Sequence, residues 1–396
     1  MKILIATQQV IPHEGGLSTH VVDLIAGLRA AGHDVRLIHA GEVIRPLWWR
    51  LIRRAACLGN LDRYIAGYLD DMVRRLAARV RREAAAFQPD LVHCHDAYAA
   101  SAALMGLGGA ALPIVETVHG PALYEARQHR AGRRPRYEAR ILRCEKEAFA
   151  GATRFITVDT GQANILKNDY GVDAGRITVI FNTVNVEDVR RTAEPQSPLQ
   201  PDAPYFLVPR RLVPKTGVRY AVEALAQVPR RDVHLVIAGQ GPERAALEAQ
   251  ASSLGLADRV HFLGSVPRAQ LLPLFPRAAG VLVPSVPASG VIEATSLAVM
   301  EAMACRTVAV ASAIGGLAEL IADGQTGLLV PPGDAPALAR AMTSVLEDQD
   351  LRVRLLAAAA RKVQEDYSTQ AWLKRILAVY ADALAQHRGA GRAGGT

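Results

Sequence analysis

The chain has 396 residues, of which 50% are hydrophobic and 21% charged, and its formal net charge is +8. Such a chain is long enough for two domains with substantial cores, and its composition is that of a soluble protein. The sequence contains no apolar run of the roughly 18 residues that a membrane-spanning helix needs. The apolar start Met1–Ala6 is too short for the core of a signal peptide. We therefore expect a cytoplasmic protein.

The four cysteines lie far apart and lack the Cys-x-x-Cys or Cys/His spacing of a zinc site. Free thiols in a reducing compartment are the expectation for such a pattern. His93 and His95 flank Cys94, but alternate residues of a strand point to opposite faces of a sheet. The sequence therefore predicts no metal site.

The positive charge is concentrated in two arginine-rich stretches, residues 45–82 and 127–143. The first stretch contains Trp48-Trp49 among the arginines Arg45, Arg50, Arg53 and Arg54. The ordinary explanation is the solvated face of a helix. Contact with an anionic membrane surface or an acidic acceptor is the functional alternative. No recognised nucleic-acid-binding motif accompanies this charge, and the sequence does not indicate an oligomeric state.

The first part of the chain alternates short apolar runs with amphipathic stretches, which predicts strands and helices in turn. The expected strands are Lys2–Ala6, Asp34–His39, Leu91–His95, Ile114–Thr117, Arg154–Val158 and Ile177–Ile180. Helices are expected between them, for example at Thr19–Ala31 and Tyr137–Ala150. This alternation predicts a parallel sheet that is covered on both faces.

A proline-rich polar segment, Glu194–Pro204, then predicts a linker, after which the alternation restarts. The expected strands are Tyr205–Pro209, Val233–Ala238, Val260–Leu263, Gly280–Pro284, Thr307–Ala311 and Gly327–Val330. The expected helices include Arg219–Gln227, Pro242–Leu254, Ala335–Glu347 and Thr369–His387. The sequence thus predicts two doubly wound α/β domains.

The expected domains are residues 1–190 and 205–367, joined by a linker at 191–204. The last helix, within residues 368–388, is expected to pack back towards the first domain. The glycine-rich residues 389–396 are expected to be disordered.

The loop after the first strand ends in Gly15-Gly16. Paired glycines let a ligand approach the backbone closely, or they simply form a turn. No Gly-x-Gly-x-x-Gly follows this strand, so a nicotinamide enzyme is not favoured. A P-loop nucleotide hydrolase is not favoured either, because the sequence lacks Gly-x-x-x-x-Gly-Lys-Ser/Thr.

Glu301 lies in the apolar run Leu297–Cys305, which follows Thr295-Ser296, a typical start of a helix. A carboxylate in a buried helix is costly unless it is paired or hydrogen-bonded. A second carboxylate, Glu293, precedes the same helix start. Carboxylates accept from sugar hydroxyls and a helix N-terminus receives anionic oxygens, so this arrangement suits a ligand with both groups. The alternative is a core acid that is satisfied by an arginine or by the backbone.

Several short motifs occur in one order along nearly the whole chain: Gly15-Gly16, Gly32-His33-Asp34-Val35, Thr117-Val118-His119-Gly120, Arg211-Leu212-Val213-Pro214-Lys215, Ala238-Gly239-Gln240-Gly241-Pro242, Phe262-Leu263-Gly264, Pro284-Ser285, and Glu293 to Glu301-Ala302-Met303-Ala304. This ordered set resembles glycosyltransferase family 4. The resemblance implies the GT-B fold, with two Rossmann-like domains facing a central cleft. It also implies that the anomeric configuration of the sugar is retained.

The resemblance implies that the second domain binds a nucleotide-sugar donor, such as a UDP-sugar or a GDP-sugar. In the family, the residue at Glu301 binds the ribose hydroxyls and the residue at Glu293 lies near the donor sugar. The diphosphate would meet the backbone of the helix start, at Thr295, Ser296 and Leu297.

Two cations are expected to act on the same diphosphate. Arg211 and Lys215 would neutralise the charge that the leaving group gains, unless they are only surface residues after a strand. Gly239, Leu263 and Val266 complete the expected donor site, with residues 262–266 contacting the nucleobase through the backbone.

The resemblance also assigns residues of the first domain. His119 would touch the donor sugar, and Gly15 and Gly16 would lie against the diphosphate. His95 and Asp96 end a predicted strand, where they either line the acceptor cleft or are structural. Glu145 is interpreted as an ion-pair partner on a helix face.

The chain departs from the family pattern at two places that matter for the donor site. The usual Glu-Gly-Phe-Gly is replaced by Glu293-Ala294-Thr295-Ser296, so side chains stand where glycine usually lets phosphate approach the backbone. The usual lysine position is Thr216, one residue after Lys215. These changes indicate a subfamily.

We therefore predict a retaining glycosyltransferase that moves a sugar from a nucleoside-diphosphate sugar to an acceptor hydroxyl, with no required metal or other cofactor. The alternatives are a sugar-nucleotide epimerase or hydrolase on the same fold, and a non-catalytic GT-B binding subunit. The acceptor is open among glycans, glycolipids and small molecules. If the basic tryptophan-containing segment binds lipid, the protein is peripheral to the inner face of the membrane.

Overall fold

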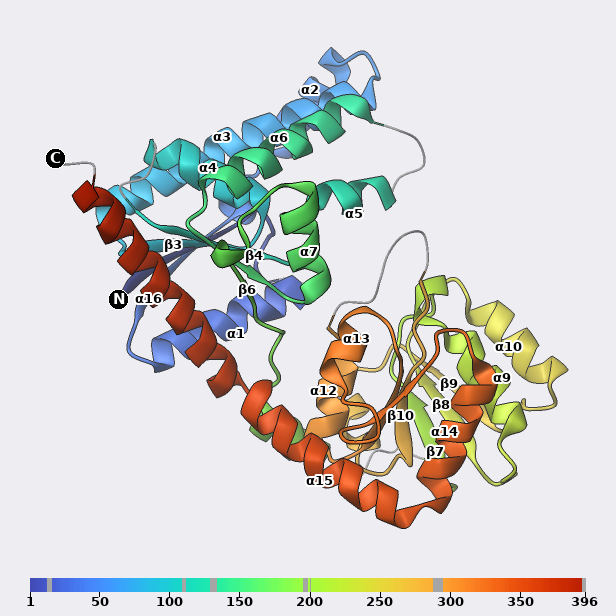
Figure 1. Ribbon diagram of the computed structural model, residues 1–396. Helices are drawn as coiled ribbons and strands as arrows, with labels where there is room; N and C mark the ends of the chain where they lie inside the picture. The colour runs from blue at the N-terminus through green and yellow to red at the C-terminus, as the bar shows by residue number, and fades with distance from the viewer. Residues whose placement is uncertain are drawn as a thin grey trace. The chain divides into compact units, whose positions relative to one another are not determined.

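The computed structural model describes residues 1–12, 16–108, 112–128, 134–194, 199, 201–287 and 295–393. The chain forms two compact units (Figure 1). Unit 1 comprises Met1–Ile180 together with Leu373–Thr396, and unit 2 comprises Phe181–Trp372. Each unit contains one six-stranded sheet in which all strand pairs are parallel. The predicted fold class, two doubly wound α/β domains, is confirmed.

Unit 1 has the strand order β2-β1-β3-β4-β5-β6. The strands are β1 (Lys2–Thr7), β2 (Asp34–His39), β3 (Leu91–Cys94), β4 (Ile114–Val118), β5 (Arg154–Thr157) and β6 (Ile177–Val179). The helices are α1 (Gly16–Ala30), α2 (Leu47–Ala56), α3 (Leu61–Phe87), α4 (Ala97–Leu107), α5 (Ala122–Gln128), α6 (Pro135–Gly151) and α7 (Thr160–Asp169), with short 3-10 turns η1 (Ala40–Glu42) and η2 (Ala174–Arg176).

Unit 2 has the strand order β12-β11-β10-β7-β8-β9. The strands are β7 (Tyr205–Val208), β8 (His234–Ala238), β9 (Val260–Gly264), β10 (Gly280–Val283), β11 (Val308–Ser312) and β12 (Leu328–Val330). The helices are α8 (Val186–Ala193), α9 (Val218–Gln227), α10 (Arg244–Ser253), α11 (Arg268–Leu271), α12 (Leu297–Ala304), α13 (Gly315–Leu320), α14 (Ala335–Glu347) and α15 (Gln349–Asp366), with η3 (Pro214–Thr216) and η4 (Leu272–Leu274).

The alternation of side chains along each strand builds a core on both faces of each sheet. In β7, Tyr205 and Leu207 pack into one cluster, whereas Phe206 and Val208 pack into the other. In β3, Val92 and Cys94 face the cluster formed with α3, α4 and α6. The residue between them, His93, faces Tyr380 of α16 (Thr369–Ala393).

The sequence located every strand to within one or two residues at each end, because most of the strands are short runs rich in apolar residues. The proline-rich segment expected as a linker follows α8, and residues 195–198 and 200 lie outside the described residues. The end of the chain differs from the expectation. Helix α16 continues through Ala393, so residues 389–393 are helical.

The contact between α16 and β3 gives a test of the packing within unit 1. Tyr380 is fully buried, and its hydroxyl lies 2.6 Å from His93 Nδ1. We expect Tyr380→Phe to lower the free energy of unfolding by about 1–3 kcal/mol, because His93 Nδ1 loses its partner in the core. Urea unfolding followed by circular dichroism measures this difference.

Tyr64→Phe is the matched control, since Tyr64 is only half-buried on α3. We expect it to change the free energy of unfolding by less than about 0.5 kcal/mol. Equal effects of the two substitutions would show that the hydrogen bond to His93 does not stabilise unit 1.

Candidate functional site

The topology of unit 2 identifies the edge of the sheet where a ligand is expected to bind. Successive strands run from β7 to β9 on one side of the sheet and from β10 to β12 on the other. The strand order therefore reverses between β7 and β10, and doubly wound sheets bind ligands beyond the carboxyl ends of such strands. Arg210, Arg211 and Lys215 follow β7, and Ser285 follows β10.

The loops after β7, β8 and β10 pack so closely that two glycines are required. Gly217 has φ +62°, and a Cβ there would lie 2.0 Å from the carbonyl oxygen of Pro284. A Cβ at Gly239 would lie 1.9 Å from the carbonyl oxygen of Arg210. The glycine expected in the donor site, Gly239, is thus explained by contact between two loops of the protein itself.

The residues after β7 differ in how they are held. The Arg210 guanidinium donates to the hydroxyl of Ser285 over 3.0 Å, which ties this loop to the loop after β10. Arg211 is exposed and Lys215 is half-buried. Thr216, at the usual lysine position, is buried and donates to the carbonyl oxygens of Arg211 and Val213 over 2.6 and 2.7 Å. Arg211 and Lys215 are therefore the cations that this turn presents outward.

The helix that carries Glu301 begins where the sequence predicts. Ser296 is the N-cap residue of α12, but its hydroxyl makes no capping hydrogen bond. The side chain is buried, and its Oγ has no hydrogen-bond partner among the described residues. Thr295 accepts from the Asn182 amide over 3.1 Å, and Leu297 is 41% exposed. The N-terminus of α12 thus retains a buried hydroxyl that the described residues leave without a partner.

Glu301 is held by one arginine. Its side chain is 14% exposed, and it accepts from Arg268 Nε over 3.1 Å. Arg268 Nη1 also reaches Asp188 on α8 over 3.1 Å. Burial raises the pKa of Glu301, and Arg268 opposes this shift. The structure therefore agrees with a core acid that is satisfied by an arginine. It also leaves room for a ligand-binding acid, because the half-exposed Arg268 can be replaced by ligand hydroxyls.

The other residues expected in the donor site lie at β9 or outside the described residues. Leu263 in β9 and Val266 after it are half-buried and pack against the core of unit 2. Glu293 and Gly15 lie outside the described residues, as does Ala294. Gly16 is the first residue of α1.

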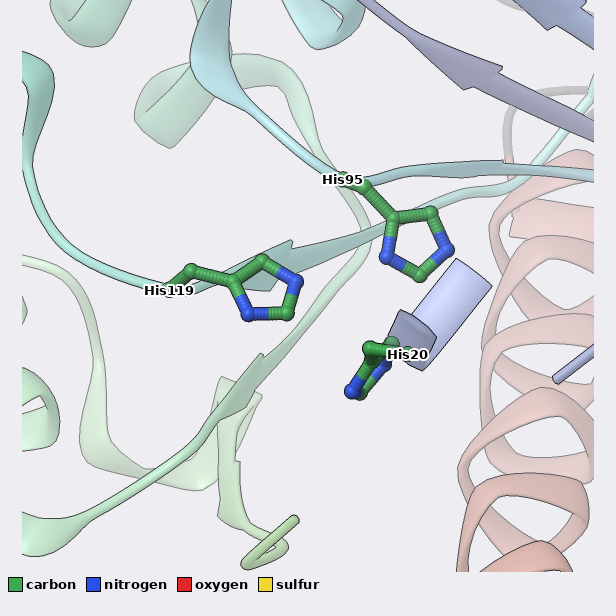
Figure 2. A group of neighbouring side chains, drawn as sticks. All are labelled: His20, His95 and His119. Atoms are coloured by element: carbon green, nitrogen blue, oxygen red, sulfur yellow. The ribbon is translucent and has the colours of Figure 1, made fainter. Parts of the chain in front are cut away.

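In unit 1, three histidines from distant parts of the sequence gather at the carboxyl ends of β3 and β4 (Figure 2). His95 follows β3, His119 follows β4, and His20 lies in the first turns of α1. The ring centroids of His20 and His119 are 4.7 Å apart, and those of His20 and His95 are 5.2 Å apart. His20 was not singled out from the sequence, because nothing in its local pattern distinguishes it from other polar residues of a helix.

The rings of His95 and His119 lie in an environment that favours their neutral form. Burial lowers the pKa of His95 and of His119 well below the ordinary value, and the neighbouring histidines lower both further. Neither ring nitrogen of His95, nor Nε2 of His119, has a hydrogen-bond partner among the described residues. These neutral imidazoles therefore carry lone pairs that the described part of the protein does not use.

Two neighbouring residues are instead fully used by the fold. The ring of His93 lies tilted against that of His95, with the centroids 4.3 Å apart, and its ring nitrogens bond to Tyr380 and Thr117 over 2.6 and 2.8 Å. Burial lowers the pKa of His93 to about 3. Asp96 caps α4 by accepting from the backbone of Ala99, and it also accepts from Thr7 and Gln8. The acceptor-side role expected for Asp96 therefore competes with a structural one.

The expectation for Glu145 is wrong. Glu145 is fully buried rather than on an exposed helix face. It accepts from the backbone N–H of Leu123 over 3.0 Å and from the hydroxyl of Tyr170. The acid satisfies the start of α5 instead of forming an ion pair. Helical spacing alone did not show that α5 and α7 cover this face of α6.

Comparison with known proteins agrees with this architecture. Residues 14–188 match the family described as Glycosyltransferase Family 4, and residues 189–362 match Glycosyl transferases group 1. A D-inositol 3-phosphate glycosyltransferase from Salinispora tropica is 30% identical over 94% of this chain and 82% of its own length.

Two solved structures share the fold. A sucrose-phosphate synthase from Thermosynechococcus elongatus has a TM-score of 0.70 at 24% identity, covering 97% of this chain and 99% of its own. HepE from Anabaena in complex with UDP has a TM-score of 0.69 at 20% identity, covering 96% and 100%. The chain therefore belongs to glycosyltransferase family 4, with the GT-B fold, as its motifs predict.

The pairing of Glu301 with Arg268 gives a second test. We expect Arg268→Ala to lower the free energy of unfolding by about 1–2 kcal/mol, because a largely buried carboxylate loses its charged partner. Adding Glu301→Gln to this variant should restore part of the loss, since a neutral amide is less costly to bury. Urea unfolding of the two single variants and the double variant measures the coupling.

Additive effects of the two substitutions would contradict this interpretation. Arg244→Ala is the control, because Arg244 forms an exposed pair with Glu248 one helical turn away. We expect that substitution to cost well under 1 kcal/mol.

Proposed function

We propose that this glycosyltransferase transfers a sugar, with retention of configuration, from a nucleoside-diphosphate sugar to an acceptor hydroxyl. The observation that carries the proposal is Glu301, a largely buried acid on α12. The N-cap of this helix, Ser296, has a hydroxyl without a hydrogen-bond partner among the described residues. A carboxylate can accept from two vicinal ribose hydroxyls, and such acceptance would offset its burial. An anionic diphosphate is stabilised at a helix N-terminus by the backbone N–H groups there.

The donor site is proposed to lie in unit 2. The phosphates are assigned to the helix start at Thr295, Ser296 and Leu297, and Glu293 is assigned to the sugar. The loops that meet at Gly239, with Leu263 and Val266, are assigned to the nucleobase. HepE is described in complex with UDP, which supports a UDP-sugar ahead of a GDP-sugar.

Charge stabilisation of the leaving group is assigned to Arg211 and Lys215. Both are presented outward after β7, at the edge of the sheet where the strand order reverses. As the glycosidic bond breaks, negative charge develops on the diphosphate, and fixed cations stabilise it. They perform the electrostatic task that a metal performs in other transferases, so we propose that transfer requires no metal.

Unit 1 is proposed to serve the sugar and the acceptor. By resemblance to the family, His119 is assigned to the donor sugar. Gly15 and Gly16 are assigned to the diphosphate on the same ground. His95 is assigned to the acceptor side, because its buried nitrogens are not used by the described residues. Asp96 is retained there as a positioning residue, since it fixes the start of α4 and the turn after β1.

The reaction follows from these assignments. An acceptor hydroxyl attacks the anomeric carbon on the face from which the diphosphate leaves. A phosphate oxygen of that leaving group takes the hydroxyl proton, the bond to the diphosphate breaks, and the glycoside forms with retained configuration. The products are the glycoside and the nucleoside diphosphate.

Glu301→Ala tests the proposal directly. We expect the variant to lose about 10- to 100-fold in affinity for UDP or GDP, because two hydrogen bonds from ribose hydroxyls to a charged acceptor are removed. Isothermal titration calorimetry with each nucleoside diphosphate measures this loss. Glu248→Ala is the control, because Glu248 is an exposed acid on α10 and should not affect nucleotide binding.

The same proteins are then incubated with nucleotide-sugars, with and without candidate acceptors, and the products are identified by mass spectrometry. Formation of a glycoside by the wild type supports the transferase. Free sugar without glycoside would indicate a hydrolase, and an isomerised donor an epimerase. Nucleotide binding that is unchanged in Glu301→Ala would overturn the donor site itself.

We also propose that α2 docks on an anionic membrane surface. No residue of α2 is buried. Leu47, Trp48, Leu51 and Ile52 follow one another at helical spacing and are 57–66% exposed. Arg53 lies over the ring of Trp49, 5.5 Å from its centroid, on the same helix. An exposed apolar stripe beside arginines is the pattern of a helix that lies in a membrane interface.

No helix in the described part of the chain has the length and apolar character to cross a membrane. We expect the protein to sediment with vesicles that contain phosphatidylglycerol and to lose this when Trp48 and Ile52 are changed to serine. Val353→Ser, at another exposed apolar residue, is the control. Equal sedimentation of both variants would contradict the role of α2.

A further inference from the structure

The histidine cluster in unit 1 has the geometry of a metal site, although the sequence predicted none. One nitrogen from each of His20, His95 and His119 lies within 4.8 Å of the other two. A point equidistant from three atoms at that separation is about 2.8 Å from each, and zinc–nitrogen bonds are about 2.0–2.1 Å long. Side-chain movements of less than about 1 Å therefore bring all three nitrogens to bonding distance of one ion.

Two of the three rings have nitrogens that are available for this purpose. The rings of His95 and His119 leave nitrogens without hydrogen-bond partners among the described residues, and His95 is only 1% exposed. Buried polar atoms without a partner are uncommon and call for an explanation. Figure 2 shows the three rings turned towards a common region from three separate segments.

The neighbouring groups define the ligand set. His93 uses both ring nitrogens on Tyr380 and Thr117 and is not free to bind an ion. Asp96 uses its carboxylate on Thr7, Gln8 and Ala99. The cluster thus consists of three imidazoles and no carboxylate, which is a set that favours zinc and other late transition metals over magnesium or calcium.

We propose that His20, His95 and His119 form a site for a divalent transition metal, with Zn²⁺ as its ion. Three protein ligands leave the fourth tetrahedral position of zinc open to water or to an oxygen ligand. The site does not depend on the proposed function. His119 is also proposed above to contact the donor sugar. If both proposals hold, an ion bound to His119 blocks that contact, and Zn²⁺ inhibits the enzyme.

Cobalt titration of the full-length protein, freed of any polyhistidine tag, tests the site. Co²⁺ replaces Zn²⁺ in three-histidine sites and shows intense visible bands when its coordination is tetrahedral. We expect one equivalent of Co²⁺ to produce these bands and Zn²⁺ to abolish them by displacement. His20→Gln should weaken Zn²⁺ binding by at least about tenfold in calorimetry, because one of three ligands is lost.

A second variant keeps the proposal testable if His20→Gln fails to fold. His20→Cys retains a ligand atom and should add a thiolate-to-cobalt charge-transfer band in the near ultraviolet. His261→Gln is the matched control, because His261 forms the other close histidine pair, with His234 at 2.7 Å. We expect His261→Gln to leave the cobalt spectrum of the cluster unchanged.

Three results would overturn the proposal. These are the absence of tetrahedral cobalt bands from the wild type, bands that persist in His20→Gln, and bands that vanish in His261→Gln. Each of them concerns metal binding alone, so failure of the metal site would leave the nucleotide-binding test of Glu301→Ala untouched. Loss of nucleotide binding in Glu301→Ala would, conversely, say nothing about the metal.

Discussion

Burial of both faces of two parallel sheets is the constraint on which the rest of this structure depends. The strands β3, β4, β7 and β10 consist entirely of buried residues. Such a sheet leaves little room for polar chemistry except beyond the strand ends. His95 and His119 follow strands of unit 1, and Arg211 and Ser285 follow strands of unit 2. Each sheet therefore concentrates its polar groups at the carboxyl edge.

Buried polar groups inside the units differ in how many hydrogen-bond partners the protein gives them. Groups with all their partners have a structural role, whereas groups with few or none can bind a ligand. His93 is paired at both nitrogens, and Glu145 accepts from a backbone N–H and a hydroxyl. By contrast, Glu301 has a single, half-exposed partner, and Ser296 Oγ has none among the described residues. These last two lie on the helix to which we assign the donor.

The sequence was sufficient for the strands, the order of elements and the start of α12, because these depend largely on local apolar runs. It was also sufficient to single out Glu301, since a lone acid in an apolar run is visible without coordinates. It did not reveal Arg268 as the partner of Glu301, because the pair is separated by 33 residues. His20 was missed for the same reason, since its neighbours in space are far away in the chain.

Asp96 and Glu145 are acids that the sequence singled out but whose contacts in the fold it did not show. An acid at the end of a strand suits a ligand, but the same acid suits the first turn of the next helix, and Asp96 is used as that cap. Glu145 has the spacing of an exposed helix face, yet α5 and α7 bring their own donors to it. Spacing along a helix predicts the direction in which a side chain points. Whether that side chain is buried depends on which other elements of the fold pack against it.

His119 is proposed both to contact the donor sugar and to bind a metal ion, and both proposals rest on its unpartnered Nε2 nitrogen. A neutral imidazole nitrogen in a buried site accepts either a hydrogen bond or a metal ion, and the same low polarity that keeps it neutral makes an unused nitrogen costly. A sugar hydroxyl relieves that cost reversibly, because it brings one donor to one nitrogen. An ion would bind one nitrogen of each of the three rings at once, which couples His20 and His95 to whatever His119 does. Selectivity between a sugar and a metal at this cluster therefore depends on how far the three rings can converge.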